Sequence, residues 1–195
     1  MSYSDAIALS RDCVLLVVLG VALYTDLTRG KVYNWCTIPA IVFGLCLAFV
    51  AGAFEEAQGN ALARFFGAPF IDALCGLALA LGVFGVACLL HAIGGGDLKL
   101  MGAIGALMGW RFFIHAAIWT ACAGAVVAVG VLIWRGRLKE GMKSSLMALF
   151  TPGRFRKRRE ALPPDAPELM TVPYVAAIAA GTLIAWLTAV PVRLP

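Results

Sequence analysis

The stretch IDALCGLALALGVFGVACLLHA, residues 71–92, decides the fold class of this chain. It contains one aspartate and one histidine, and almost every other side chain in it is apolar. A helix that crosses the hydrocarbon core of a bilayer needs about 20 mostly apolar residues. The stretch therefore predicts a transmembrane helix.

The whole chain is too apolar for a soluble protein. Of its 195 residues, 62% are hydrophobic and 14% are charged, and the mean hydropathy is +0.89. Soluble domains have roughly 45–50% apolar and about 25% charged residues. A body of this size still exposes about a third of its surface, so it cannot hide that excess. The composition therefore predicts an integral membrane protein.

Further apolar runs lie on both sides of residues 71–92. They predict an all-α, polytopic membrane helix bundle that forms a single membrane-embedded domain over residues 1–195. About six transmembrane helices are expected, at residues 6–25, 36–54, 71–92, 98–110, 112–134 and 172–190.

The distribution of positive charge predicts the side on which the termini lie. An even number of spans places both termini on one side of the membrane. If the N terminus is outside, twelve Lys and Arg residues fall in inner segments and four in outer segments. Because inner loops carry the excess of positive charge, both termini are predicted to be outside.

The segment 135–170 carries most of the net charge of +5 and is predicted to be a basic cytoplasmic loop. Its basic run at residues 154–159 could suggest nucleic acid, but beside a membrane it is better explained as an anchor on anionic lipid. Apolar residues at helical spacing predict a helix that lies in the interface: Leu138, Met142, Leu146 and Leu149. We therefore expect membrane lipid, and no nucleic acid, as a partner of this loop.

The cysteines and histidines do not suggest a metal or a cofactor. No two of the six cysteines have the short spacing of a zinc site or a redox motif, so we expect them to be small buried apolar residues. His91 and His115 lie at opposite ends of expected spans, with no carboxylate or cysteine nearby in sequence. Both are interpreted as packed or interfacial side chains.

Three aspartates lie against or inside apolar runs, where ionisable groups are expensive and usually functional. Asp72 is expected at the outer end of its span, where its carboxylate reaches water. Asp26 ends the first expected span and Asp97 begins the fourth. The predicted topology places both of these on the cytoplasmic side, at the same membrane depth.

Asp26 and Asp97 each have a structural interpretation as well. Asp26 lies in a polar turn and could end a helix with Arg29 as its partner. Asp97 follows three successive glycines, Gly94 to Gly96, and could cap the helix that begins after it. The alternative is chemical. Two carboxylates about 3 Å apart cannot both ionise, so one keeps a proton while the other acts as a base, without a metal or a nucleophile.

The residues around both aspartates resemble a known family. The sequence GGGD at residues 94–97 fits the Gly-x-Gly-Asp signature of membrane aspartyl proteases. The chain resembles the type IV prepilin peptidases in an ordered set of motifs: Asp26 with KVYN at 31–34, GGGDLKL at 94–100, and VPY at 172–174. It looks most like the short forms that serve Flp-type (tight-adherence) pili.

This resemblance implies an activity and a site. Asp26 and Asp97 would be the catalytic pair of a peptidase in the bacterial inner (cytoplasmic) membrane. Gly94, Gly95, Gly96 and Lys99 would contact the substrate. The enzyme would remove the basic leader of a prepilin or pseudopilin after a glycine, at the cytoplasmic face and without a cofactor. Association with the pilus assembly machinery is a further expectation.

The chain departs from the family pattern in two places. Larger prepilin peptidases carry a cytoplasmic region with paired Cys-x-x-Cys zinc ligands and an N-methyltransferase activity. This sequence has no Cys-x-x-Cys, so a methyltransferase activity is not expected. The usual Ile-Pro-Asn after the first aspartate is Val32-Tyr33-Asn34 here.

Other classes remain open on the sequence alone. A proton-coupled membrane transporter would use the aspartates as proton sites, but would need acidic residues along a path across the membrane. A non-catalytic pilus-assembly subunit would rely on small-residue packing such as Gly105-x-x-x-Gly109. A presenilin-type protease would place its aspartates deeper within apolar helices than Asp26.

Overall fold

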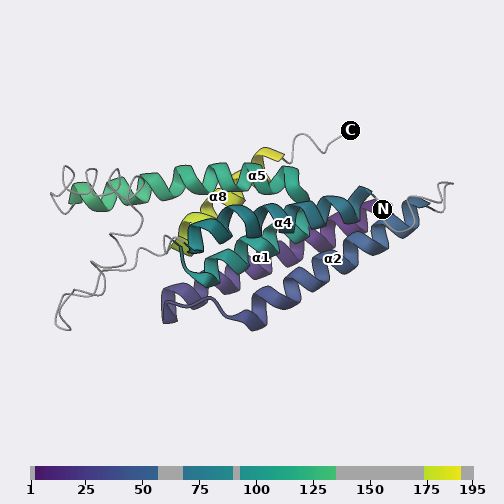
Figure 1. The fold of residues 1–195 in the computed structure, drawn as a ribbon, viewed down its shortest axis with the longest axis horizontal. Helices are drawn as coiled ribbons and strands as arrows, with labels where there is room; N and C mark the ends of the chain where they lie inside the picture. The colour runs from purple at the N-terminus through teal and green to yellow at the C-terminus, as the bar shows by residue number, and fades with distance from the viewer. Residues whose placement is uncertain (1–2, 57–67, 90–92, 135–173, 190–195) are drawn as a thin grey trace.

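The computed structural model describes residues 3–56, 68–89, 93–134 and 174–189. All of their regular secondary structure is helical, as the sequence predicts (Figure 1). The helices are α1 (Tyr3–Arg29), α2 (Asn34–Glu56), α4 (Ala68–Leu89), α5 (Gly95–Trp134) and α8 (Tyr174–Ala189). The expected loop at residues 135–170, with its interfacial helix, lies outside the described residues.

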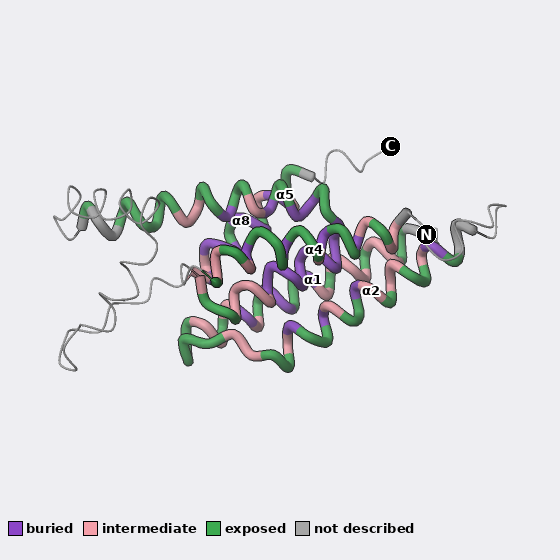
Figure 2. The backbone as a smooth tube through the Cα atoms, in the orientation of Figure 1, coloured by how far each residue is buried: buried purple, intermediate pink, exposed green. Residues whose placement is uncertain are grey.

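Helix α5 is the centre of the bundle. It packs against each of the other helices, most extensively against α4 and α8. Residues 100–109 of α5 are all buried, whereas its later residues are largely exposed (Figure 2). Leu100, Met101 and Ile104 have no exposed surface. The core of the bundle is therefore built around the start of α5.

The helices have the length and composition of membrane spans. About a quarter of the residues in each of these spans are buried inside the bundle. Four described stretches are long and apolar enough to cross a membrane: Asp5–Arg29, Asn34–Ala53, Pro69–Leu89 and Gly95–Gly130. Helix α8 is apolar but shorter. The chain is thus a multi-pass membrane protein. The count of six spans and the sides of the two termini stay predictions.

Helix α5 is two helices joined by a kink at Gly109. This glycine has φ 81° and ψ 173°, a combination that only glycine adopts readily. Figure 1 shows the second half of α5 running back along the bundle. The kink lies at the boundary that the sequence predicts between its fourth and fifth helices, at residues 98–110 and 112–134.

A second constraint acts on Gly109. A Cβ atom at this position would collide with the side-chain carboxylate of Asp72, which lies near the start of α4. Asp72 therefore lies at the end of its helix, where the sequence places it, and packs against the kink. Only a residue without a side chain satisfies both the backbone angle and this contact.

Substituting Gly109→Ala is expected to destabilise the protein by about 3 kcal/mol, because alanine is strained at this angle and also meets Asp72. Unfolding of the purified protein by SDS, followed by circular dichroism, measures the loss. The double variant G109A/D72A is expected to recover only the part of the lost stability that the collision with the Asp72 carboxylate causes. Equal stability of Gly109→Ala and wild type would contradict the strained kink.

Two details of the sequence-based picture are wrong. Helix α1 does not end near residue 25 but continues to Arg29, because Gly30 (φ +61°) ends it and donates its amide hydrogen to the Asp26 carbonyl at 2.8 Å. The cysteines are not buried. All six are free, and four of them are exposed on the surface of the bundle, where a membrane protein faces lipid: Cys13, Cys46, Cys75 and Cys122.

Candidate active site

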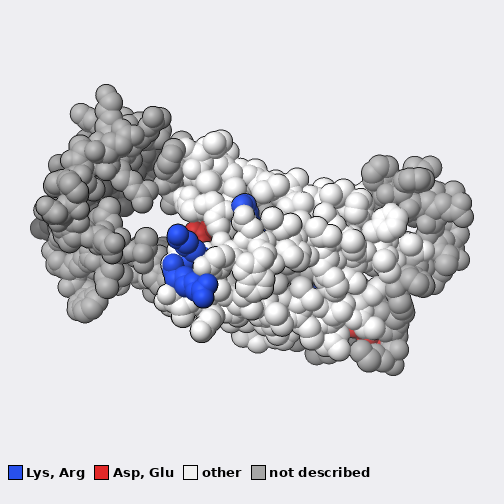
Figure 3. Space-filling view, turned by 90° about the horizontal axis from the view of Figure 1, so that it is seen from below, with Lys and Arg blue, Asp and Glu red and all other residues white. Residues whose placement is uncertain are grey.

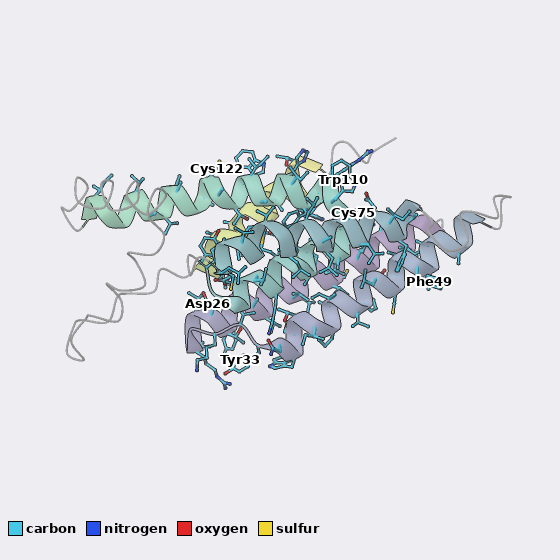
Figure 4. All side chains as sticks on the ribbon, viewed as in Figure 1. Asp26, Tyr33, Phe49, Cys75, Trp110 and Cys122 are labelled. Carbon is cyan, nitrogen blue, oxygen red and sulfur yellow. The ribbon has the colours of Figure 1, made fainter. Side chains whose placement is uncertain are left out.

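Asp26 lies in the last turn of α1, so it is helical rather than part of a polar turn. The cap at Gly30 extends the helix past it and fixes its backbone. Figure 4 shows the labelled Asp26 at the end of the bundle where α5 and α8 begin. The side chain is half-buried, and its Oδ2 atom is inaccessible and has no hydrogen-bond partner among the described residues.

Asp97 lies in the first turn of α5, which begins three residues earlier than the capping interpretation requires. Gly94 immediately precedes the helix, and its carbonyl accepts the Leu98 amide at 3.3 Å. The Asp97 carboxylate reaches back to the Gly94 backbone amide, which is the geometry of a capping box. Asp97 therefore does cap its helix, from inside the first turn.

The two carboxylates come together from distant parts of the chain. Asp26 and Asp97 lie close enough to repel each other electrostatically when both are ionised. Each is half-buried. A structural cap needs one carboxylate, and Arg29 is exposed and contacts Tyr33 rather than Asp26. The two carboxylates are therefore neighbours, and the capping contact accounts for only one of them.

Helix α8 adds two contacts to this pair that the sequence analysis does not foresee. The half-buried Tyr174 interacts electrostatically with Asp97, and the backbone amide of Val175 faces Asp26. The VPY motif belongs to the family resemblance, which assigns no role to its tyrosine. The available signal is that the last expected span begins on the same side as Asp26 and Asp97.

The three glycines before Asp97 lie in different surroundings. Gly94 and Gly95 are exposed, and a Cβ atom at Gly95 would meet nothing within 4 Å. A Cβ atom at Gly94 would lie 3.3 Å from the Asp97 carboxylate. Gly96 instead packs against Val32, with 3.0 Å from its Cβ position to the valine Cβ. Gly94 and Gly95 therefore border open space beside the carboxylates, and Gly96 contacts the α1–α2 connection.

Lys99 does not extend freely into solvent. Its Nζ donates a hydrogen bond of 2.8 Å to the Oδ1 of Asn34, the first residue of α2. Figure 3 shows that Lys and Arg side chains gather beside an acidic spot on a face that is otherwise mostly uncharged. Arg29, the last residue of α1, and Lys31, in the connection from α1 to α2, are both exposed. Positive charge thus borders the acidic pair.

No three His, Cys, Asp or Glu side chains within the described ranges group in a way that could hold a metal ion. An apolar groove runs along α4 and is lined by residues of that helix and Trp110. It includes neither aspartate. The polar chemistry of the described residues is concentrated where α1, α5 and α8 meet.

Comparisons with known proteins identify a family that this chain matches. A family model described as the type IV leader peptidase family matches residues 13–129, which is more than half of the chain and includes both aspartates. Two similar proteins are the prepilin leader peptidase/N-methyltransferases of Burkholderia pseudomallei strains 1026b and K96243. Each is 31% identical over 114 residues, which is 58% of this chain and 34% of the relative. The match thus spans about a third of these relatives, and no solved structure matches the chain.

Proposed function

Because this chain belongs to the type IV leader peptidase family, we propose that it is a membrane aspartyl endopeptidase that removes the leader of type IV prepilins or pseudopilins. Asp26 and Asp97 are its catalytic pair. The observation that carries this proposal is the convergence of the two carboxylates, from the end of α1 and the start of α5, at one half-buried place.

The pair performs hydrolysis by general acid–base catalysis. The ionised carboxylate takes a proton from a water molecule, and the water oxygen attacks the carbonyl carbon of the scissile peptide bond. The other carboxyl then donates its proton to the departing amine as the C–N bond breaks. The buried Asp26 Oδ2 atom has no hydrogen-bond partner among the described residues, which suits the oxygen that carries the proton of the pair. The two aspartates titrate as a pair, so these roles belong to the pair.

The open space beside Gly94 and Gly95 receives the substrate backbone. An extended peptide can approach Asp97 here, because glycine has no side chain that would block it. The apolar helix of the substrate docks laterally between spans, while its basic leader stays in water. We place this site at the cytoplasmic face of the bacterial inner membrane, with cleavage after a glycine and a substrate of the Flp type.

The proposal is tested with the full chain in detergent or lipid vesicles and a synthetic Flp-type prepilin. The products are identified by mass spectrometry. Two fragments that meet at the glycine before the apolar segment support the peptidase. An intact substrate in the presence of the folded chain, across prepilins of several pilus types, would contradict it.

The rate of cleavage is expected to have a bell-shaped dependence on pH. At low pH both carboxyls are protonated and no base remains, whereas at high pH both are ionised and no acid remains. A metal chelator is expected to leave the rate unchanged, because the pair activates water directly. The measurement is kcat/KM of the reconstituted chain from acid to alkaline pH, with and without chelator. A rate that falls with chelator and returns with added metal would refute this mechanism.

A further inference from the structure

Two contacts hold the α1–α2 connection against the start of α5. Lys99 donates a hydrogen bond to Asn34 at 2.8 Å. Gly96 packs against the side chain of Val32, which itself contacts the hydrophobic core. Gly96 lies one residue before Asp97 and Lys99 two residues after it. We call the pair of Lys99 and Asn34 the clasp.

The same connection, residues 30–33, follows the last turn of α1, which contains Asp26. Gly30, its first residue, donates its backbone amide hydrogen to the Asp26 carbonyl. Its last residues lead into the first turn of α2, where the amides of Cys36 and Thr37 bond the Tyr33 carbonyl. A displacement of the connection away from α5 would therefore carry the end of α1, with Asp26, away from Asp97.

We infer that Lys99 is a positioning residue, which holds the α1–α2 connection on α5 through Asn34 and thereby sets the separation of Asp26 and Asp97. The inference rests on the proposed function, because the aspartates must act as a pair for their separation to matter. It assigns Lys99 a role different from the substrate contact that the sequence resemblance implies.

The clasp acts on geometry more than on stability. Its hydrogen bond is exposed, and water replaces an exposed bond at little net cost in the free energy of unfolding. Catalysis is far more sensitive, because two carboxyls that share one proton must stay within hydrogen-bonding reach of the same water. Loss of the clasp is therefore expected to reduce the rate while the folded bundle keeps its stability.

The test compares Lys99→Met, Asn34→Ala and the double variant. Each single change is expected to lower kcat by about a hundredfold, the order of effect of misplacing a catalytic group, with little change in KM. The double variant is expected to be no slower than either single one, because both remove the same bond. Asn34→Asp keeps the acceptor and is expected to retain most of the activity.

Arg29→Met is the matched control. It removes a positive charge from the same end of α1, and within the described part of the chain its side chain bonds only the nearby Tyr33. Its kcat is expected to remain within about threefold of wild type, since exposed charges of this kind contribute little. A hundredfold loss in this control would attribute the effect to charge and overturn the positioning role.

A second measurement does not depend on activity. Hydrogen exchange at the amides of Cys36 and Thr37 is expected to be faster in Lys99→Met and Asn34→Ala than in wild type, while resistance to SDS is unchanged. Unchanged exchange would overturn the clasp. A raised KM in Lys99→Met, with Asn34→Ala active, would show instead that the lysine binds substrate. If wild type itself cleaves no prepilin, the proposed function fails, and the exchange data still decide whether the clasp exists.

Discussion

Replacing Asp97 or Asp26 with asparagine is expected to lower kcat for prepilin cleavage by about 10³- to 10⁴-fold. Each carboxyl has a separate task in the proposed reaction, one as a base and one as an acid, and an amide performs neither at neutral pH. Because each turnover needs both the base and the acid, either substitution alone is expected to cause this loss of kcat.

The asparagine variants should fold. Asparagine has the size of aspartate, and its Oδ1 atom still accepts the Gly94 amide that Asp97 accepts in the first turn of α5. The matched control is Asp72→Asn, which lies near the start of α4 beside the Gly109 kink and outside the pair. This control is expected to retain its activity.

Cleavage is measured on a synthetic prepilin with equal amounts of folded enzyme, judged by gel filtration in detergent. If Asp26→Asn keeps wild-type activity while Asp97→Asn is inactive, then Asp97 acts without the partner assigned to it. Loss of activity in Asp72→Asn as well would indicate a general effect of removing acidic residues, and would argue against a special pair.

The substitution Gly105→Val is expected to have the largest effect on the fold. A Cβ atom at Gly105 would lie inside the backbone of Gly76, and one at Gly76 would meet the Gly105 carbonyl. Glycines of this kind let membrane helices approach backbone to backbone. Valine forces α4 and α5 apart, at a cost of about 3 kcal/mol or more. Since α5 contacts every other helix, the whole bundle is expected to loosen.

Gly85→Val is the control for this change. Gly85 is on the same helix as Gly76, but a Cβ atom there meets nothing within 4 Å. Both variants are extracted in mild detergent and unfolded with SDS. Gly105→Val is expected to unfold at a clearly lower SDS fraction or to aggregate, and Gly85→Val to resemble wild type. Equal resistance of the two variants would contradict the close crossing of α4 and α5.

Much of the architecture is predictable because membrane spans have a strong sequence signal. Apolar runs of about 20 residues predict the all-helical, multi-pass chain without any knowledge of packing. The boundary at Gly109 is predictable as well, since Arg111 interrupts the apolar run there. The predicted convergence of Asp26 and Asp97 follows from topology alone, because both flank spans on one side.

The details of the site depend on contacts that apolar patterns do not contain. The extension of α1 past Asp26 could have been predicted from Arg29-Gly30, a basic residue followed by a glycine that ends a helix. The contacts of Tyr174 and Val175 with the aspartates need the packing of α8 against the rest of the bundle. The bond between Lys99 and Asn34 joins residues 65 apart, and hydropathy says nothing about such a pair.

The catalytic pair is tested most directly by the N-terminal sequence of a prepilin recovered from membranes that contain this chain. With wild type, we expect a mature pilin that begins immediately after the leader glycine. With Asp26→Asn or Asp97→Asn at equal membrane levels, we expect the full-length prepilin. Leader removal that survives either substitution would contradict a catalytic pair of Asp26 and Asp97.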